Sequence, residues 1–407
     1  MCLVAERWWP TFSGAARRFE QYLPGLADRG VDVQVICPNQ VAGVPPGGQH
    51  DDRGSDVVTI DLPAERSWRR NALFQSKIAE HVADRGADVV HFLTLEPLRT
   101  FSSRGLRGMG RKPARLFTGT LIPGTAGGYP ARFKQRLWLR HAIGAMDHLV
   151  VSSDVMGEYY RSLGIGTPRT VIPNGVNLSR FRPVGSAADR RAARAGLGLP
   201  EDAEVLLFIG SIIRRKGVDL LVDSFLRLSA GRPNAHLLIV GPEGSSTDDR
   251  ELRSEIDRML ITCAGADRVH FVGQVPMADP YYRAADLFVL PSRREGMGNV
   301  VLEAMATELP VVLTPYVGLP EELGDPGREY ILCEHDADAL ASEIGALLDD
   351  PDRRLSLGTA ARRWMEEHMD MEVVIDDYAR LYQNLAVEGR PATVVPTGAG
   401  EPRAHAD

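Results

Sequence analysis

The sequence lacks any apolar run of about 18 residues, the length that a membrane-spanning helix needs. Its first residues, MCLVAERWWP, form too short a stretch for a secretion signal and carry Glu6 where such a signal stays apolar. Together these absences predict a cytoplasmic protein that does not cross a membrane.

Cysteine is scarce as well. The 4 cysteines show neither a CxxC spacing nor a paired pattern; they are Cys2, Cys37, Cys263 and Cys333. This usage is typical of a reducing compartment, and it argues against a disulfide framework and against a zinc site.

Positive charge is not in excess, since 47 basic residues face 54 acidic ones and the net charge is −7. Such a mildly acidic balance gives no support for nucleic-acid binding as the main activity. Lysine is rare, because arginine supplies almost all of the positive charge. The lysines are Lys77, Lys112, Lys134 and Lys216. Each lysine that is present is therefore more informative than usual, Lys216 above all.

Short apolar runs alternate with helical patterns along the whole chain, which predicts βαβ units and parallel sheets. The strand candidates are 2–5, 31–37, 56–61, 88–93, 114–118, 148–152 and 169–173 in the first half, and 205–211, 236–241, 269–273, 287–292, 310–314 and 330–334 in the second. These runs are apolar on both faces, as strands covered by helices must be. The fold class is therefore α/β, with two Rossmann-like domains.

The length of 407 residues suits two domains rather than one hydrophobic core. We expect an N-terminal domain at 1–180, a linker rich in Pro, Gly, Ala and Arg at 181–203, and a C-terminal domain at 204–368. A last helix at 369–387 and a disordered tail at 388–407 complete the prediction. Two such domains would face each other across a cleft at the carboxyl ends of their strands, where such sheets bind ligands.

Loops that suit a phosphate-bearing ligand follow the strands of the second half. In LLFIGSIIRRKG the basic cluster Arg214-Arg215-Lys216 precedes a helix, and cations beside free helix amides favour a diphosphate. Taken alone, a solvated basic turn is the simpler interpretation of this cluster. Gly241 and Gly273 end the next strands, and each by itself is compatible with an ordinary turn.

Two glutamates stand out in PSRREGMGNVVLEAMATELPVV. Glu303 lies in a helix that is otherwise apolar nearly all round, and a carboxylate there needs a partner. Asn299 precedes Glu303 by four residues, so both lie on one helix face. Vicinal hydroxyls are natural partners for this carboxylate. Glu295 lies in the glycine-rich turn before the helix.

The stretch EGMGNVVLEAMA resembles the E-x7-E signature of retaining GT-B glycosyltransferases, in particular glycosyltransferase family 4. VIPNGVNLSRF, FIGSIIRRKGVDLLVDSF, LLIVGPEG, VHFVGQVP, YYRAADLFVLPS and VGLPEEL match the family in order and spacing. The first domain matches more loosely. The resemblance implies transfer of a sugar from a UDP- or GDP-type nucleotide sugar to a hydroxyl of a lipid, polysaccharide or small molecule.

By similarity, the catalytic residues are Glu295, Lys216 and Arg215, with Glu295 at the donor sugar and the cations at the diphosphate. The resemblance places Glu303 on the ribose hydroxyls and Gly273-Gln274-Val275 on the base. Further donor contacts fall on Gly14, Arg214, Gly241, Gly296, Met297, Gly298, Asn299 and Val300. Acceptor contacts fall on Trp8, Trp9, His91 and Thr120; a core histidine is the other interpretation of His91, and domain-anchoring tryptophans that of Trp8 and Trp9.

The resemblance also implies a front-face mechanism without a protein nucleophile, a metal or another cofactor. Two positions depart from the family pattern. Ser211 stands where members usually carry an arginine, and Thr120 or Gly119 stands where many carry a histidine. These departures leave open a nucleotide-sugar-binding subunit with weak or lost catalysis; a sugar epimerase is the other enzymatic alternative.

The segment 129–146, YPARFKQRLWLRHAIGAM, combines basic and apolar side chains at helical spacing. It could lie on an anionic membrane surface as a peripheral contact. A solvated helix whose apolar stripe packs on its own domain is the commoner explanation of such a pattern.

Overall fold

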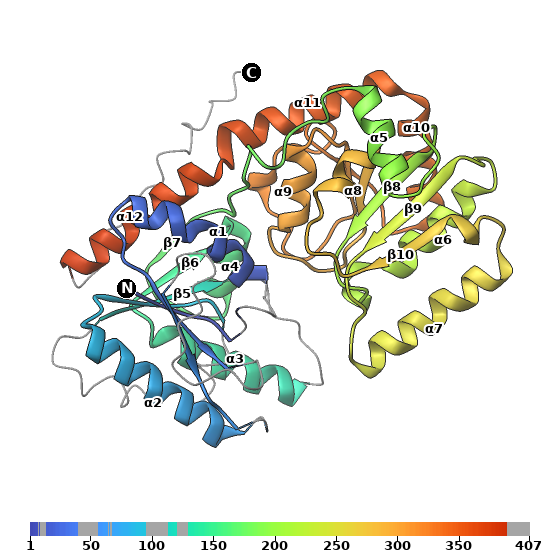
Figure 1. The fold of residues 1–407 in the computed structure, drawn as a ribbon. Coiled ribbons are helices and arrows are strands. Elements are labelled where there is room, and N and C mark those ends of the chain that lie inside the picture. Colours follow the sequence, from blue (N-terminus) through green and yellow to red (C-terminus); the bar gives the residue numbers. More distant parts are fainter. Residues whose placement is uncertain are drawn as a thin grey trace, which may run out of the picture. The chain divides into compact units, whose positions relative to one another are not determined.

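The computed structural model describes residues 1–6, 8, 14–39, 56–63, 65, 67–94, 113–119 and 129–388. The chain divides into two compact units (Figure 1). The first unit joins Met1–Asn174 to the chain from Glu372 onward, and the second unit is Gly175–Met371. The predicted disordered tail lies outside the described residues except for Glu388, which ends the last helix.

The first unit contains a seven-stranded sheet in the order β3-β2-β1-β4-β5-β6-β7. Its described strand pairs are parallel. The strands are β1 (Cys2–Val4), β2 (Gln34–Pro38), β3 (Asp56–Ile60), β4 (Val89–Phe92), β5 (Ala114–Gly119), β6 (His148–Val151) and β7 (Arg169–Val171). The helices are α1 (Gly14–Asp28), α2 (Trp68–Arg85), α3 (Tyr129–Gly144), α4 (Asp154–Ser162) and α12 (Met371–Glu388).

The second unit contains a six-stranded sheet in the order β10-β9-β8-β11-β12-β13, also with parallel pairs. The strands are β8 (Glu204–Ile209), β9 (Ala235–Val240), β10 (Val269–Gly273), β11 (Leu287–Leu290), β12 (Val311–Leu313) and β13 (Ile331–Leu332). The helices are α5 (Ala187–Gly196), α6 (Val218–Ser229), α7 (Thr247–Thr262), α8 (Asp279–Ala284), α9 (Asn299–Ala306), α10 (Ala337–Asp349) and α11 (Pro351–His368).

The predicted strands all occur, because runs that are apolar on both faces have no stable place except between helix layers. β1, β4, β6 and β11 are buried at every residue. Local signals set the helix ends: Ser246 and Asp249 form a capping box at the start of α7, and Ser67 caps α2. The α/β expectation with two Rossmann-like units is therefore confirmed.

The boundary between the units lies at Asn174–Gly175, earlier than the predicted linker at 181–203. That segment is part of the second unit, because its helix α5 packs on α8. Arg194 of α5 is buried and holds both carboxylate oxygens of Asp286 at 2.7 Å. Alanine and arginine give 181–203 the composition of a linker, but one of its arginines faces inward.

Helix α12 packs within the first unit although it comes last in the chain. Its Tyr378 is buried with the ring centroid 5.0 Å from that of Phe19 in α1. Arg29, just after α1, pairs with Glu372 at 3.1 Å and with Asp376. The first unit is thus complete only when the end of the chain is in place.

Among the described helices, none has the combination of length and apolar character that crossing a bilayer requires. Leu139, Ala142 and Ile143 of α3 are buried in the core of the first unit, while Leu137 is exposed. The predicted membrane contact through 129–146 stays a prediction, since the side chains before Lys134 lie outside the description.

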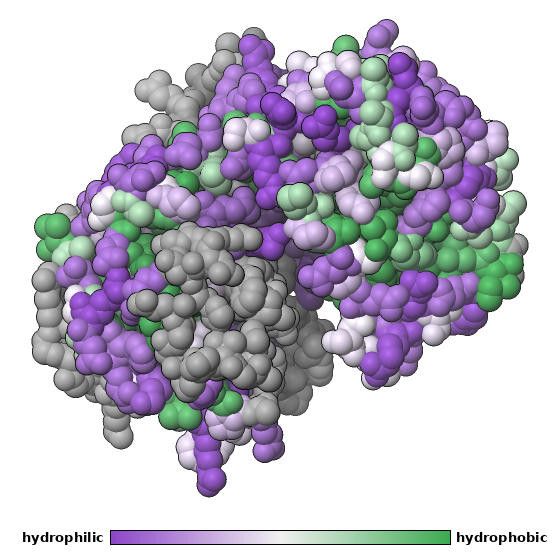
Figure 2. All heavy atoms as spheres, in the orientation of Figure 1, coloured by the Kyte–Doolittle hydropathy of each residue, from purple (hydrophilic) through white to green (hydrophobic). Residues whose placement is uncertain are grey.

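Figure 2 shows apolar side chains gathered over the β10 side of the second unit. The edge strand β10 is partly exposed at every residue.

Candidate functional site

The second sheet has a topological switch point between β8 and β11. β9 and β10 extend the sheet on one side of β8, and β12 and β13 extend it beyond β11. The carboxyl ends of β8 and β11 meet at this switch point, which is where open α/β sheets bind ligands. These two loops carry the predicted residues Lys216 and Glu295.

The loop after β8 is shaped by glycine. Arg214–Lys216 form one turn of 3-10 helix, and Gly217, with φ +69°, is the N-cap of α6. A Cβ at Gly217 would lie 1.9 Å from the carbonyl oxygen of Pro291, so no larger residue fits. The backbone N–H of Arg293 donates to the Arg215 carbonyl at 2.8 Å. The two loops are consequently fastened together at their backbones.

Lys216, Arg215 and Glu295 meet in one ion cluster. Arg215 Nη1 lies 2.9 Å from Glu295 Oε2, and the Lys216 ammonium also pairs with this oxygen. Lys216 is only 8% exposed. Burial alone would raise the pKa of Glu295, but Lys216 and then Arg215 outweigh it and lower that pKa. The cluster thus contains two cations for one carboxylate and keeps a net positive charge at the switch point.

Arg214, predicted as a donor-binding residue, points elsewhere. Its guanidinium contacts Glu255 at 2.9 and 3.0 Å and Asp248 at 3.0 Å, and both of these acids lie on α7. The turn of 3-10 helix directs neighbouring side chains to different sides, so Arg215 rather than Arg214 stands beside Lys216. Arg214 therefore does not replace the arginine missing at Ser211.

Helix α9 begins directly after Gly298, as predicted, and carries Asn299, Val300 and Glu303. Glu303 Oε2 accepts a hydrogen bond of 2.8 Å from the hydroxyl of Tyr282, which is almost fully buried on α8. Tyr282 lies in the stretch YYRAADLFVLPS, but an aromatic residue in an amphipathic helix is usually a core residue, so the sequence does not predict its contact with Glu303. This hydrogen bond is the partner that a carboxylate on an apolar helix requires.

The remaining predicted donor residues lie near the same edge. Gly241 and Gly273 follow or end neighbouring strands, and the Gly241 N–H donates to the Gly273 carbonyl at 2.9 Å. Gln274 is exposed and Val275 is partly buried just after β10. Gly296 and Met297 are buried in the turn between Glu295 and α9. The strand ends thus gather these residues at one edge, and their roles stay predictions.

Two polar atoms near Glu295 belong to residues that the sequence analysis does not predict as site residues. Arg294 Nε and the Tyr316 hydroxyl are buried and find no hydrogen-bond partner within the described part of the chain. The negative charge of Glu295 is close enough to help burial raise the pKa of Tyr316. Buried polar groups without partners mark places where a ligand or water supplies the missing bond. In the sequence, the one hint of a role for Arg294 is its position directly before the predicted site residue Glu295.

In the first unit, two predicted acceptor residues are core residues instead. His91 is fully buried, with Nδ1 2.8 Å from the Tyr382 hydroxyl and Nε2 2.5 Å from Thr118 Oγ1. Burial, helped by the charge of Arg18, lowers the pKa of His91 to about 3. Trp8 is 4% exposed and presents no open face to a sugar ring. Trp9 and Thr120 lie outside the described residues, and Gly14 is exposed at the start of α1.

Similarity to solved structures defines the class of this fold. Sucrose-phosphate synthase of Thermosynechococcus elongatus is similar with a TM-score of 0.77 and 25% identity, over 94% of this chain and 98% of that one. Anabaena HepE in complex with UDP-glucose is similar in fold, with a TM-score of 0.74 at 19% identity over 93% and 98% of the two chains. The fold is the GT-B fold of glycosyltransferases.

Sequence comparison then gives the family. A model described as "Glycosyltransferase Family 4" matches residues 12–180, and one described as "Glycosyl transferases group 1" matches residues 203–350. The chain is 31% identical to a GDP-mannose-dependent monoacylated alpha-(1-6)-phosphatidylinositol monomannoside mannosyltransferase of Corynebacterium glutamicum, over 80% of this chain and 85% of that protein. The protein belongs to glycosyltransferase family 4.

A second relative is a D-inositol 3-phosphate glycosyltransferase of Kineococcus radiotolerans. It is 33% identical over 61% of this chain, and the match spans 60% of that relative's own length. The resemblance expected from the E-x7-E stretch is confirmed at the level of the family.

Proposed function

We propose that the protein is a retaining glycosyltransferase that moves a sugar from a nucleotide-diphosphate sugar to an acceptor hydroxyl. The observation that carries this proposal is the cluster of Lys216 and Arg215 around Glu295 at the switch point of the second sheet. It joins two cations suited to a diphosphate with a carboxylate suited to a sugar hydroxyl.

The donor is a UDP- or GDP-type sugar. The Corynebacterium relative is described as GDP-mannose-dependent, and the Anabaena structure holds UDP-glucose. Both ligands share a ribose and a diphosphate. Glu303, held by Tyr282, is suited to accept hydrogen bonds from a ribose diol, and the amides that begin α9 are suited to a phosphate oxygen.

Departure of the diphosphate is driven by charge. The transition state has oxocarbenium character, while negative charge grows on the β-phosphate. Lys216 and Arg215 provide compensating charge, and the burial of Lys216 strengthens its field because little water screens it. In this proposal the reaction needs no metal ion and no other cofactor.

Retention follows if the acceptor attacks from the side on which the diphosphate leaves. The departing phosphate then takes the proton of the acceptor hydroxyl, and no side chain becomes covalently attached. Glu295 orients the donor sugar by accepting a hydrogen bond from a hydroxyl. The acceptor is a lipid, a polysaccharide or a small molecule that the first unit recognises.

Turnover tests this proposal. Purified protein is incubated with UDP- and GDP-sugars and candidate acceptors, and release of nucleoside diphosphate is measured together with the anomeric configuration of the product by NMR. We expect release that depends on an acceptor, survives EDTA and gives a product with the configuration of the donor. A product of inverted configuration would contradict the mechanism.

One observation favours a second candidate, a nucleotide-sugar-binding subunit with weak or lost catalysis. Ser211 occupies the usual arginine position, and Arg214 is held by Glu255 and Asp248 instead of replacing it. This candidate predicts that UDP or GDP raises the unfolding temperature of the protein while no acceptor produces turnover.

A further inference from the structure

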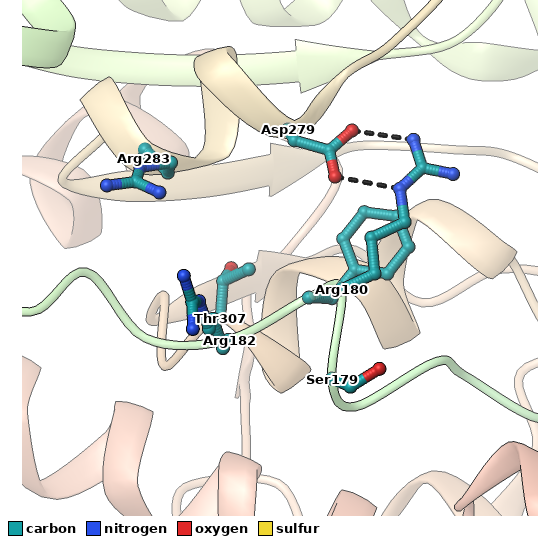
Figure 3. A pocket seen from close by; sticks show the side chains of 7 residues that line it. Ser179, Arg180, Arg182, Asp279, Arg283 and Thr307 are labelled. Atoms are coloured by element: carbon teal, nitrogen blue, oxygen red, sulfur yellow. Dashed lines mark hydrogen bonds and ion pairs between the residues drawn. The ribbon is translucent and has the colours of Figure 1, made fainter.

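A polar hollow of about 310 Å³ lies within the second unit, and none of its lining residues belongs to the Lys216 cluster. Ser179, Arg180, Phe181 and Arg182 form one wall soon after the start of this unit, and the other lining residues come from α8 and the end of α9 (Figure 3). Ligand sites in proteins begin at about 300 Å³, so the hollow can hold a small metabolite.

The charges in this hollow do not cancel. Arg180 is occupied by Asp279, with contacts of 2.8 and 2.6 Å, and its guanidinium stacks on Phe181 at 5.0 Å from the ring centroid. Figure 3 shows this pair, while no interaction within the hollow reaches Arg182 or Arg283. Two guanidinium charges are therefore left over for a ligand.

Unpaired arginines are unusual in this unit. Arg190, Arg194, Arg215, Arg227, Arg232, Arg253 and Arg293 each have a carboxylate partner. Four arginine side chains of this unit have no hydrogen bond or ion pair with the described residues. They are those of Arg182, Arg191, Arg283 and Arg294. Arg182 and Arg283 both line the same hollow although they are about a hundred positions apart in the chain.

The hydroxyls in the hollow do not compete for these guanidinium groups. Ser179 Oγ donates to Asn177 Oδ1 at 2.8 Å, and Thr307 Oγ1 donates to the Ala304 carbonyl at 2.8 Å. The free donors are thus the N–H groups of Arg182 and Arg283. Planar guanidinium forks bind the oxygens of a phosphate in pairs, which makes phosphate the best-matched anion.

We propose that this hollow is a second ligand site, which binds the phosphate group of a small soluble metabolite through Arg182 and Arg283. The Arg180–Asp279 pair joins the two walls, and the buried ring of Phe181 supports the Arg180 guanidinium. The volume exceeds that of about ten water molecules, so the site takes a phosphate ester with its organic part rather than a bare ion.

Calorimetric titration of the full chain with glucose 6-phosphate at constant ionic strength tests the proposal, with glucose as the uncharged comparison. We expect the double variant Arg182→Gln/Arg283→Gln to bind the sugar phosphate about 10- to 100-fold more weakly, the loss expected for hydrogen bonds to a charged group. The matched control is Arg191→Gln/Arg363→Gln, which removes the same charge from two arginines that are exposed, as Arg182 and Arg283 are, but do not line the hollow; it should bind as the wild type does.

The variant Lys216→Met distinguishes binding in the hollow from binding at the proposed donor site, since it removes a cation of the Glu295 cluster and leaves the hollow unchanged. Unchanged binding of glucose 6-phosphate in Lys216→Met supports the hollow as the site. Equal affinity in wild type and Arg182→Gln/Arg283→Gln, or loss of binding in Lys216→Met alone, would overturn it. Neither result bears on glycosyl transfer, because no donor is present.

Vesicles of phosphatidylcholine with and without phosphatidic acid form the second arm. A small-metabolite site predicts no retention on either vesicle through Arg182 and Arg283. Retention on the anionic vesicles that these two substitutions abolish, without binding of glucose 6-phosphate, would instead assign the hollow to a lipid headgroup and overturn the proposal. Thermal unfolding of each variant confirms that it is folded.

Discussion

Arg18 of α1 carries a buried charge that the described residues do not balance. The residue is 4% exposed, and its Nε and Nη2 atoms have no hydrogen-bond partner there. Its described contact is with the ring of Phe19, 5.4 Å away. Removing an uncompensated buried charge usually stabilises a protein, because the cost of its desolvation disappears.

We expect Arg18→Met to raise the free energy of unfolding by about 1–3 kcal/mol, within the range seen when apolar residues replace buried charges. Urea titration of both variants and wild type measures the change. Arg17→Met is the matched control, since Arg17 is the exposed neighbour on the same helix and its substitution should have little effect. A loss of stability in Arg18→Met would mean that the guanidinium has a structural partner.

The two glutamates should respond differently to substitution. Glu303→Ala removes a carboxylate suited to the ribose, so UDP or GDP should bind about 10- to 100-fold more weakly. Glu295→Gln leaves the nucleotide contacts but removes the charge that Lys216 and Arg215 pair with. The diphosphate of a bound UDP or GDP can take the place of the lost carboxylate beside Lys216 and Arg215. Added UDP or GDP should therefore raise the unfolding temperature of Glu295→Gln more than that of wild type.

Calorimetry and thermal unfolding with UDP and GDP measure both effects. Equal nucleotide affinity in Glu303→Ala and wild type would remove the ribose assignment. A smaller thermal shift in Glu295→Gln than in wild type would show that the diphosphate does not meet the Lys216 cluster.

At the scale of single elements, the loop from β8 into α6 depends on one glycine. Gly217 has φ +69°, and a Cβ there would approach the Pro291 carbonyl oxygen to 1.9 Å. We expect Gly217→Ala to lower the free energy of unfolding by about 3 kcal/mol or more, since it adds backbone strain to a backbone clash. It should also weaken nucleotide binding, because Lys216 precedes the displaced residue.

Gly231→Ala is the control for this prediction. Gly231 follows the other end of the same helix, and no heavy atom lies within 4 Å of a Cβ there. Urea unfolding should show little change for Gly231→Ala. If both substitutions cost the same, helix α6 would be sensitive to glycine replacement in general and the contact with Pro291 would not matter.

The elements themselves could be predicted well, because apolar runs and glycine punctuation act locally. Side-chain directions could not. Arg214 and Arg215 are neighbours, and only the 3-10 turn decides that one pairs with α7 and the other with Glu295. His91 is a site candidate only as a substitute for the histidine that many family members carry near Thr120, but helix α12 supplies Tyr382 and buries it. Contacts between distant segments are absent from local patterns.

At the scale of the whole molecule, a buried histidine should make the first unit sensitive to acid. The pKa of His91 is about 3 in the folded chain against an ordinary value of 6.5, because burial disfavours the charged ring. The unfolded state therefore binds a proton between these values while the folded state does not. Stability is retained above pH 6.5 and falls as the pH drops towards 3.

Between pH 7 and pH 5, His91 should lower the unfolding free energy of the first unit by about 2 kcal/mol. His148, whose burial lowers its pKa to about 4, acts in the same direction. Urea titrations at pH 7, 6 and 5 measure the slope, with hydrogen exchange of the β4 amides reporting on the first unit. His91→Gln should be less stable at pH 7 but show a shallower dependence on pH; an unchanged slope would contradict the prediction.

Helix α12 has a consequence for the order in which the protein folds during synthesis. The first unit needs residues from Glu372 onward, whereas everything in Gly175–Met371 has by then left the ribosome. At about 5–20 residues per second, the first sheet waits roughly 10–40 s for its last helix. The second unit, translated later, can therefore mature first, and the newborn first unit exposes the apolar surface around Phe19 and Tyr22 until α12 arrives.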